Sequence, residues 1–239
     1  MRNLCLGDAS DGSAAAHVFF VAENALPHRS ESLVRSRYLL LLTLALIGAG
    51  YFGPWVAHPA AGLILSADDL GEWVKFLPVY RAGGSGLIRE LFYAPIWLVS
   101  LGLGLWAARL TSAAGKLVVV ALSALLVFTP LPKYPELLSA FREPEFAPTF
   151  WITVGALIVS TGAAIFGARL PDRVTAVLWV ILGLSAALIA PLHFWKATTE
   201  IEELYSFSIG WGVMATIVGG LLLAATGVAA FSKRNRASR

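Results

Sequence analysis

The sequence predicts an all-α protein, a bundle of six membrane-spanning helices, and three observations predict this class. First, 57% of the 239 residues are hydrophobic and only 14% are charged, whereas soluble domains carry about a quarter charged residues. Second, the apolar residues form long runs of about twenty, the length that a helix needs to cross the hydrocarbon core. Third, the charged residues lie between these runs, with more basic residues on alternate sides.

The apolar runs define the predicted elements in chain order. Spans are expected at 38–57, 91–110, 116–132, 149–168, 174–194 and 208–231, the third being the shortest. We therefore divide the chain into a mobile cytoplasmic N-terminal tail (1–37), a six-helix transmembrane domain (38–231) and a basic cytoplasmic C-terminal tail (232–239).

The charges predict an orientation. If both termini lie on one side, 12 of the 18 Lys and Arg residues fall on that side and 6 on the other. Short cytoplasmic segments are enriched in Lys and Arg, so both ends are expected in the cytoplasm and the protein in the cell membrane. Because the basic residues sit at span ends and form no groove, the sequence pI of about 9.2 does not indicate a nucleic-acid partner.

A weak repeat of two spans is visible. Each odd span is expected to end at a proline near the outer face, namely Pro54, Pro130 and Pro191. A unit of two spans keeps the same orientation in successive copies, so these are parallel repeats. Chance similarity of interface composition is the alternative explanation.

An outer linker with helical periodicity follows each odd span. In the first linker Ser66 is expected to cap a helix with Asp69 at its third position. Thr199 and Glu202 have the same spacing in the third linker, and Leu137 and Phe141 are apolar positions of the second. We expect short amphipathic helices on the outer membrane surface; a lid over a cavity is the alternative.

The even spans carry small residues at every fourth position. Helices in lipid associate through such strips because small side chains let backbones approach closely. The strips predict packing against other spans or against a partner subunit. They are Ser100, Gly104 and Ala108 in span two; Ala156, Ser160, Ala164 and Ala168 in span four; and Gly212, Thr216, Gly220 and Ala224 in span six.

Two histidines are weak candidates for binding a cofactor. His58 and His193 each follow a repeat proline at the outer end of a span, and a neutral imidazole can ligate a haem iron. With Trp55 and Trp195 nearby, the ordinary interpretation is that both belong to the aromatic belt at a membrane interface. No cofactor is therefore predicted.

The outer carboxylates are weak candidates for a calcium site, since oxygen ligands suit that ion. They also fit the solvated faces of surface helices. The candidates are Asp68, Asp69, Glu72, Glu200, Glu202 and Glu203, with a third group at Glu136, Glu143 and Glu145.

The sequence gives no complete catalytic motif and no sign of a charge-coupled pump. Ser85 lies in a Gly-rich run without the Gly-x-Ser-x-Gly pattern of hydrolases. No charge is expected well inside a span, which disfavours a charge-coupled pump. Arg89 and Glu90 lie at the outer end of span two, where we expect them to reach water by snorkelling.

Three functions remain open. A non-enzymatic subunit or scaffold that packs on partner membrane proteins through the small-residue faces of spans two, four and six is favoured. A transporter or channel for a neutral or apolar solute is the first alternative. A redox subunit that binds haem or quinone through His58 and His193 is the second.

Overall fold

The computed structural model describes residues 27–58, 63–83, 86–133, 135–202 and 206–237. The chain divides into two compact units, Met1–Tyr38 and Leu39–Arg239. In the first unit the described part is the beginning of helix α2 (Pro27–Phe52), which starts well before the span expected at 38. Residues 1–26 of the predicted tail lie outside the described residues.

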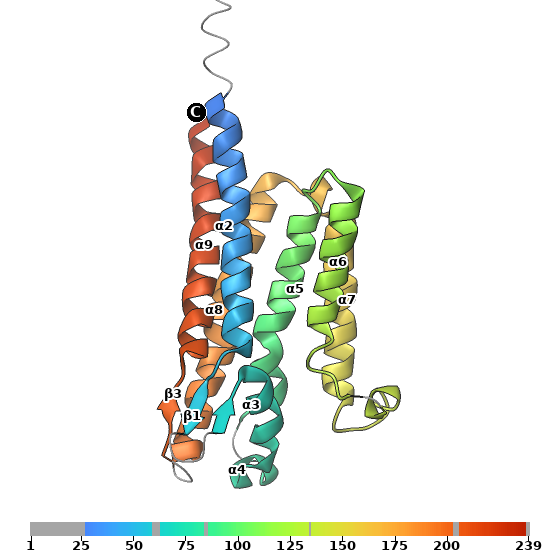
Figure 1. The fold of residues 1–239 in the computed structure, drawn as a ribbon, viewed down its shortest axis with the longest axis vertical. Helices are drawn as coiled ribbons and strands as arrows, with labels where there is room; N and C mark the ends of the chain where they lie inside the picture. Colours follow the sequence, from blue (N-terminus) through green and yellow to red (C-terminus); the bar gives the residue numbers. More distant parts are fainter. Residues whose placement is uncertain (1–26, 59–62, 84–85, 134, 203–205, 238–239) are drawn as a thin grey trace, which may run out of the picture. The chain divides into compact units, whose positions relative to one another are not determined.

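Helices dominate the described chain, as Figure 1 shows. The long ones are α2, α5 (Ala94–Ala107), α6 (Ala113–Val127), α7 (Ala147–Phe166), α8 (Asp172–Glu202) and α9 (Trp211–Ala237). The short ones are α3 (Ala67–Trp73), α4 (Pro78–Arg81) and four 3-10 turns, η1 (Val74–Phe76), η2 (Arg89–Tyr93), η3 (Glu136–Leu138) and η4 (Gly167–Arg169). Helix α9 continues into the segment predicted to be a C-terminal tail.

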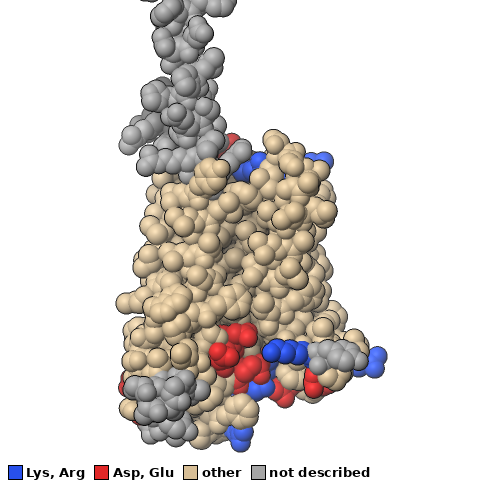
Figure 2. Space-filling model, in the orientation of Figure 1, with Lys and Arg blue, Asp and Glu red and all other residues tan. Residues whose placement is uncertain are grey.

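Four helical segments are long and apolar enough to cross a membrane: Arg89–Ala107, Ala147–Arg169, Asp172–Glu202 and Trp211–Ser232. The apolar segments Tyr38–Phe52 and Ala113–Val127 are shorter. The predicted helical class is thus confirmed and four helices are candidate membrane spans, whereas six spans and the repeat are not confirmed. Large apolar side chains such as Leu117 and Leu125 are about 70% exposed, and a broad band without charge separates the charged ends of the face in Figure 2.

A small antiparallel sheet closes one end of the Leu39–Arg239 unit. Strands β1 (Val56–His58), β2 (Leu63–Leu65) and β3 (Ser208–Ile209) lie in the order β2-β1-β3. Val56 faces Leu65 on one side and Ile209 on the other. The sheet therefore joins the end of α2 to the start of α9, and we call this end of the unit the sheet end.

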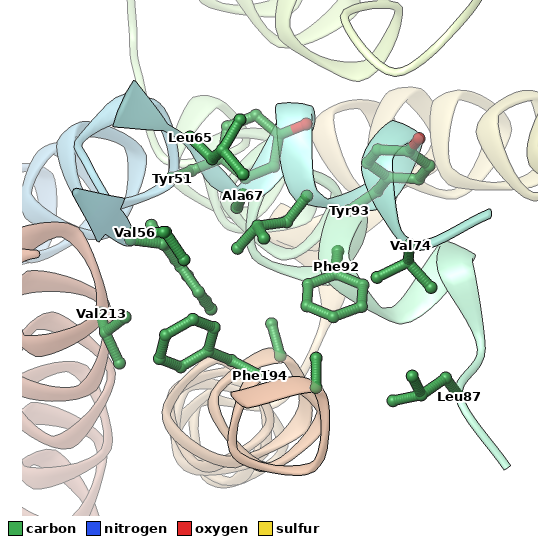
Figure 3. Close-up of a cluster of buried hydrophobic side chains, with 14 of the residues drawn as sticks. Tyr51, Val56, Leu65, Ala67, Val74, Leu87, Phe92, Tyr93, Phe194 and Val213 are labelled. Carbon is green, nitrogen blue, oxygen red and sulfur yellow. The ribbon is translucent and has the colours of Figure 1, made fainter. Parts of the chain in front are cut away.

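The larger hydrophobic core lies directly beneath the sheet. Figure 3 shows side chains from the sheet, α3, η2 and α8 converging on it. Trp55, Tyr51, Phe92 and Phe194 are fully buried, and the rings of Trp55 and Phe194 meet edge to face at 5.4 Å. Each such side chain stabilises the fold by roughly 1.5–3 kcal/mol.

Helix α8 differs from the prediction, because it continues through Pro191 to Glu202. Pro191 does not end the span, and Thr199 lies inside the helix and does not cap a new one. A proline removes one helical hydrogen bond. The additional turns bury Phe194, Ala197 and Ile201 in the core, and this burial outweighs the lost bond.

The first linker behaves as predicted and the second only in part. Ser66 caps α3 as half of a capping box: Asp69 N donates to Ser66 Oγ at 3.2 Å, and Ser66 N donates to Asp69 Oδ2 at 2.9 Å. In the second linker Leu137 belongs to a single 3-10 turn, η3, and Phe141 follows it. Pro135 and Pro144, which flank this segment, disfavour a longer helix there.

The small-residue strips pack between helices of this chain. A Cβ on Gly104 would overlap the carbonyl oxygen of Ser160, so this contact joins α5 closely to α7. Likewise a Cβ on Gly220 would meet the Gly183 carbonyl at 2.6 Å, between α9 and α8. A third contact joins α9 to α2 at Gly212, Thr216 and Gly50. Of the two options left open by the sequence, packing against other spans is the one observed.

We expect Gly104→Ala to destabilise the protein by about 1–3 kcal/mol, since overpacking forces two helix backbones apart. The matched control is Gly162→Ala in α7, where an added Cβ meets nothing within 4 Å. This control should be neutral or slightly stabilising, because alanine favours helix by roughly 0.5–1 kcal/mol. Unfolding in detergent, followed by circular dichroism, measures both; equal effects would contradict the close contact.

Candidate functional site

Arg89 is the centre of a buried ion network at the sheet end. It begins η2, directly before α5, and only 2% of it is exposed. Its Nη1 donates to the Glu145 carbonyl at 3.1 Å and its Nε to the Tyr93 hydroxyl at 3.3 Å. Its Nη2 lies 2.8 Å from Glu72 Oε1, a charge contact without a well-aligned hydrogen bond.

This burial overturns the expectation that Arg89 snorkels to water. An arginine at a span end reaches water only if nothing covers it. Here α3 and the segment before α7 fold over the guanidinium, which also lies 5.5 Å from the centre of the Phe146 ring. Sequence reasoning missed this partner because Glu72 and Arg89 are separated by the linker, and no local spacing connects them.

Lys75 extends the network from Glu72 to Glu145, in the segment before α7. Its Nζ lies 2.6 Å from Glu72 Oε2 and 2.5 Å from Glu145 Oε1, and the Tyr93 hydroxyl donates to Glu72 Oε1 at 2.8 Å. Two acidic and two basic side chains thus alternate from α3 to the start of α7. Neutral charge balance inside the network reduces the cost of desolvating it.

The network sets the protonation of its half-buried members, Glu72 and Lys75. Burial raises the pKa of Glu72, but the hydrogen bond from Lys75 and the charge of Arg89 outweigh it, so the pKa lies below its ordinary value. Burial lowers the pKa of Lys75, yet its bonds to Glu145 and Glu72 raise it above the ordinary value. Both groups are therefore charged at neutral pH.

A hollow of about 650 Å³ opens beside this network. One wall is the α3–α4 segment with Phe76, Tyr80 and Arg81, and the other is the segment that leads into α7 with Pro144 and Pro148. Lys75, Arg89, Glu90 and Glu145 also line it. Its volume falls in the range of small-molecule sites.

A second polar contact lies closer to the sheet. Tyr51, which is fully buried, donates from its hydroxyl to Asp68 Oδ1 at 2.7 Å. Burial raises the pKa of Asp68 above its ordinary value, although the bond from Tyr51 opposes this. Asp68 is therefore easier to protonate than a solvated aspartate, while Glu72 on the same helix is harder to protonate.

The weak candidate calcium ligands on α3 have other partners in this structure. Asp68 accepts from Tyr51, Asp69 completes the capping box, and Glu72 pairs with Lys75 and Arg89. Glu200 and Glu202 lie in the last turn of α8, and Glu203 is outside the described residues. Within the described ranges, no group of three or more His, Cys, Asp or Glu side chains is placed to hold a metal.

The two histidines are placed only in part. His193 lies on α8 with its ring 6.3 Å from that of Phe92, and its buried Nε2 has no hydrogen-bond partner in the described part of the chain. His58 ends strand β1, but its side chain is outside what the structure describes. A cofactor shared by the two histidines thus stays the weak alternative that the sequence left open.

Three buried serines join α5, α6 and α7 in the apolar region. Ser123 Oγ lies 2.6 Å from Ser100 Oγ and 2.7 Å from Ser160 Oγ, and Ser160 Oγ also donates to the Ser100 carbonyl at 2.8 Å. Hydroxyls bonded to backbone carbonyls in this way hold membrane helices together. The small residues at every fourth position of the even spans included Ser100 and Ser160. Sequence reasoning missed Ser123, whose one sign of a polar contact is a hydroxyl among the apolar residues of α6.

Comparison with known protein families, with curated proteins and with solved structures finds no match for this chain. The chemical assignment therefore depends on the residues themselves.

We expect Arg89→Met to lower the free energy of unfolding by about 1.5–3 kcal/mol, because it removes a buried guanidinium that contacts Glu72 and donates hydrogen bonds to the Glu145 carbonyl and the Tyr93 hydroxyl. The matched control is Arg109→Met, which breaks the pair with Asp172 at 3.0 Å. Both side chains of that pair are more than a third exposed, so its loss should cost below about 1 kcal/mol. Chemical unfolding in detergent measures the difference; similar losses would show that Arg89 is not structurally central.

The carboxylates of α3 predict opposite pH effects. Because the pKa of folded Glu72 is lowered, its stabilisation is present above its unfolded pKa of about 4.3 and is lost as pH falls through the folded pKa. Glu72→Gln should thus destabilise at pH 7 and progressively less below pH 4. Because the pKa of folded Asp68 is raised, its ionisation costs stability as pH rises from about 3.9. Asp68→Asn should stabilise at pH 7 and be neutral at pH 3.5.

Melting temperatures of the wild type and both variants at pH 3.5, 5 and 7 test this pair. Variant effects that do not change with pH would contradict the assigned shifts.

Proposed function

We propose that this chain is a non-enzymatic subunit or scaffold of the cell membrane, with six spans and both termini in the cytoplasm. The six long helices would be the spans, with α2 extended by its residues before Tyr38 and α6 the short member. The 12-to-6 distribution of Lys and Arg supports this orientation. The sheet end is then the outer end.

The packing of α5 and α7 supports the proposed repeat of two-span units. Thr149 bonds Glu90, 59 residues away, and Ser160 bonds Ser100, 60 residues away. A nearly constant separation means that the two helices run parallel and in register. Parallel packing of equivalent helices is what tandem hairpins in one orientation require.

The observation that carries the subunit proposal is the exposure of α7. Only 22% of its most apolar stretch is buried, against 50% for α8, 39% for α9 and 72% for the segment Arg89–Ala107. Its outward side carries Gly155 and Gly162, where an added Cβ would meet nothing within 4 Å. Trp151, Ile158 and Ile165 on the same helix are 59–65% exposed.

A partner helix is the occupant that fits this side of α7. Two glycines separated by two turns make a shallow strip that lets a second backbone approach, and such approach drives helix association in lipid. The small faces of α5 and α9 already contact neighbouring helices of this chain. The outward side of α7 is thus the better docking face.

The two alternatives have less support. A transporter is favoured by two buried polar atoms without partners in the described residues, Trp97 Nε1 and Thr153 Oγ1. Against a transporter, Gly104 of α5 closely contacts Ser160 of α7, which leaves little space for a solute between these two helices. A redox subunit is supported only by the unpartnered His193 Nε2.

Purification of the tagged full chain from its native membrane in mild detergent tests the proposal. We expect a membrane protein to co-purify in a fixed ratio. Gly155→Leu with Gly162→Leu should reduce its recovery at least tenfold. The control, Gly48→Leu on α2, also adds a side chain at a position with nothing within 4 Å and should leave recovery unchanged.

A monomeric wild type without co-purifying protein, or equal recovery with all variants, would contradict the subunit proposal.

A further inference from the structure

Two charged side chains that line the hollow beside Arg89, Arg81 and Glu90, form no ion pair among the described residues. Within the described residues, Arg81 has no acidic partner: its Nε donates to the Lys75 carbonyl at 3.3 Å, and its guanidinium lies 5.7 Å from the Phe76 ring centre. Glu90 forms no ion pair there, although its charge interacts with that of Arg89, and it accepts one long bond, 3.3 Å, from Thr149 Oγ1. The hollow thus offers one guanidinium and one carboxylate.

The other ionised groups of the lining are engaged with one another. Lys75 bridges Glu72 and Glu145, and Arg89 contacts Glu72 and the Glu145 carbonyl. These contacts fix the wall of the hollow from both sides. A ligand is therefore not needed to neutralise them, and its charges are set by Arg81 and Glu90.

The charge pair selects among ligand classes. A simple anion at Arg81 meets the Glu90 carboxylate in the same hollow, and a simple cation at Glu90 meets Arg81. A neutral apolar solute leaves both charged groups without a partner as it displaces their water, which is costly. A molecule with both charges satisfies both, since a guanidinium has five donors and a carboxylate accepts several bonds.

We propose that the hollow between the α3–α4 segment and the start of α7 binds a small zwitterion, a primary ammonium joined by a short spacer to a phosphate or carboxylate. The anionic group contacts Arg81 and the ammonium contacts Glu90. Phe76 and Tyr80 contact the spacer. The proposal is independent of the partner-docking role of α7.

Two sources supply this chemistry, a phospholipid with an ethanolamine headgroup and a free zwitterion of the aqueous phase. The hollow lies where the apolar segment Arg89–Ala107 begins, which is headgroup level for a spanning helix. Phe76 and Ile88 beside it are 59% and 50% exposed, as expected of side chains that meet the glycerol and upper acyl region of a lipid.

The test measures binding to the purified full chain with two probes. Native mass spectrometry counts the lipid retained from nanodiscs of phosphatidylethanolamine or phosphatidylglycerol, and calorimetry measures O-phosphoethanolamine. We expect retention of phosphatidylethanolamine over phosphatidylglycerol, with Arg81→Gln and Glu90→Gln each weakening binding about tenfold or more, as for loss of one charged hydrogen bond.

Matched controls are Arg142→Gln and Glu136→Gln, exposed charges of the second linker outside this lining. They should bind as the wild type does. Binding of O-phosphoethanolamine with the same variant pattern and no lipid preference would support the zwitterion site and assign it to a soluble ligand. Equal retention of phosphatidylglycerol without binding of O-phosphoethanolamine, an unaffected Glu90→Gln variant, or no binding of either probe would overturn the proposal.

Discussion

Close approach of helix backbones is the constraint on which the rest of the structure depends. Lipid supplies no hydrophobic force between helices, so their association needs dispersion contacts and polar bonds at short range. Gly104 against Ser160 and Gly220 against Gly183 provide such contacts. With the helices this close, the serine hydroxyls reach across to neighbouring carbonyls, and large apolar side chains are left to face outward.

At the sheet end the stabilising interactions change in kind. Here the linker folds over the helix ends, and a buried guanidinium is tolerated because Glu72, the Glu145 carbonyl and the Tyr93 hydroxyl surround it. Since the partners of Arg89 come from α3 and from the segment before α7, one side chain connects the first linker to the second. The same connection shapes the hollow, whose two walls it holds at a fixed separation.

The sequence predicted what depends on local patterns. Long apolar runs located the helices, fourfold spacing located the contact residues, and Ser66 with Asp69 marked the start of α3. The sequence did not predict features that depend on residues far apart in the chain. The burial of Arg89 depends on a carboxylate in another element. The continuation of α8 past Pro191 depends on a core built by the sheet and η2. A hollow between two linkers has no local signature either, so the candidate site was not predictable as a unit.

The pairing of β1 with β3 has a consequence for biogenesis. Ser208 bonds the carbonyl of Ala57, 151 residues earlier, and contacts this distant in sequence form late because closing a long loop is entropically costly. During synthesis β1 is made first and has no β3 partner until the helices between the two strands have been made. Its free edge is paired only when β3, directly before α9, has been made, and a product that ends before β3 would expose that edge to other chains.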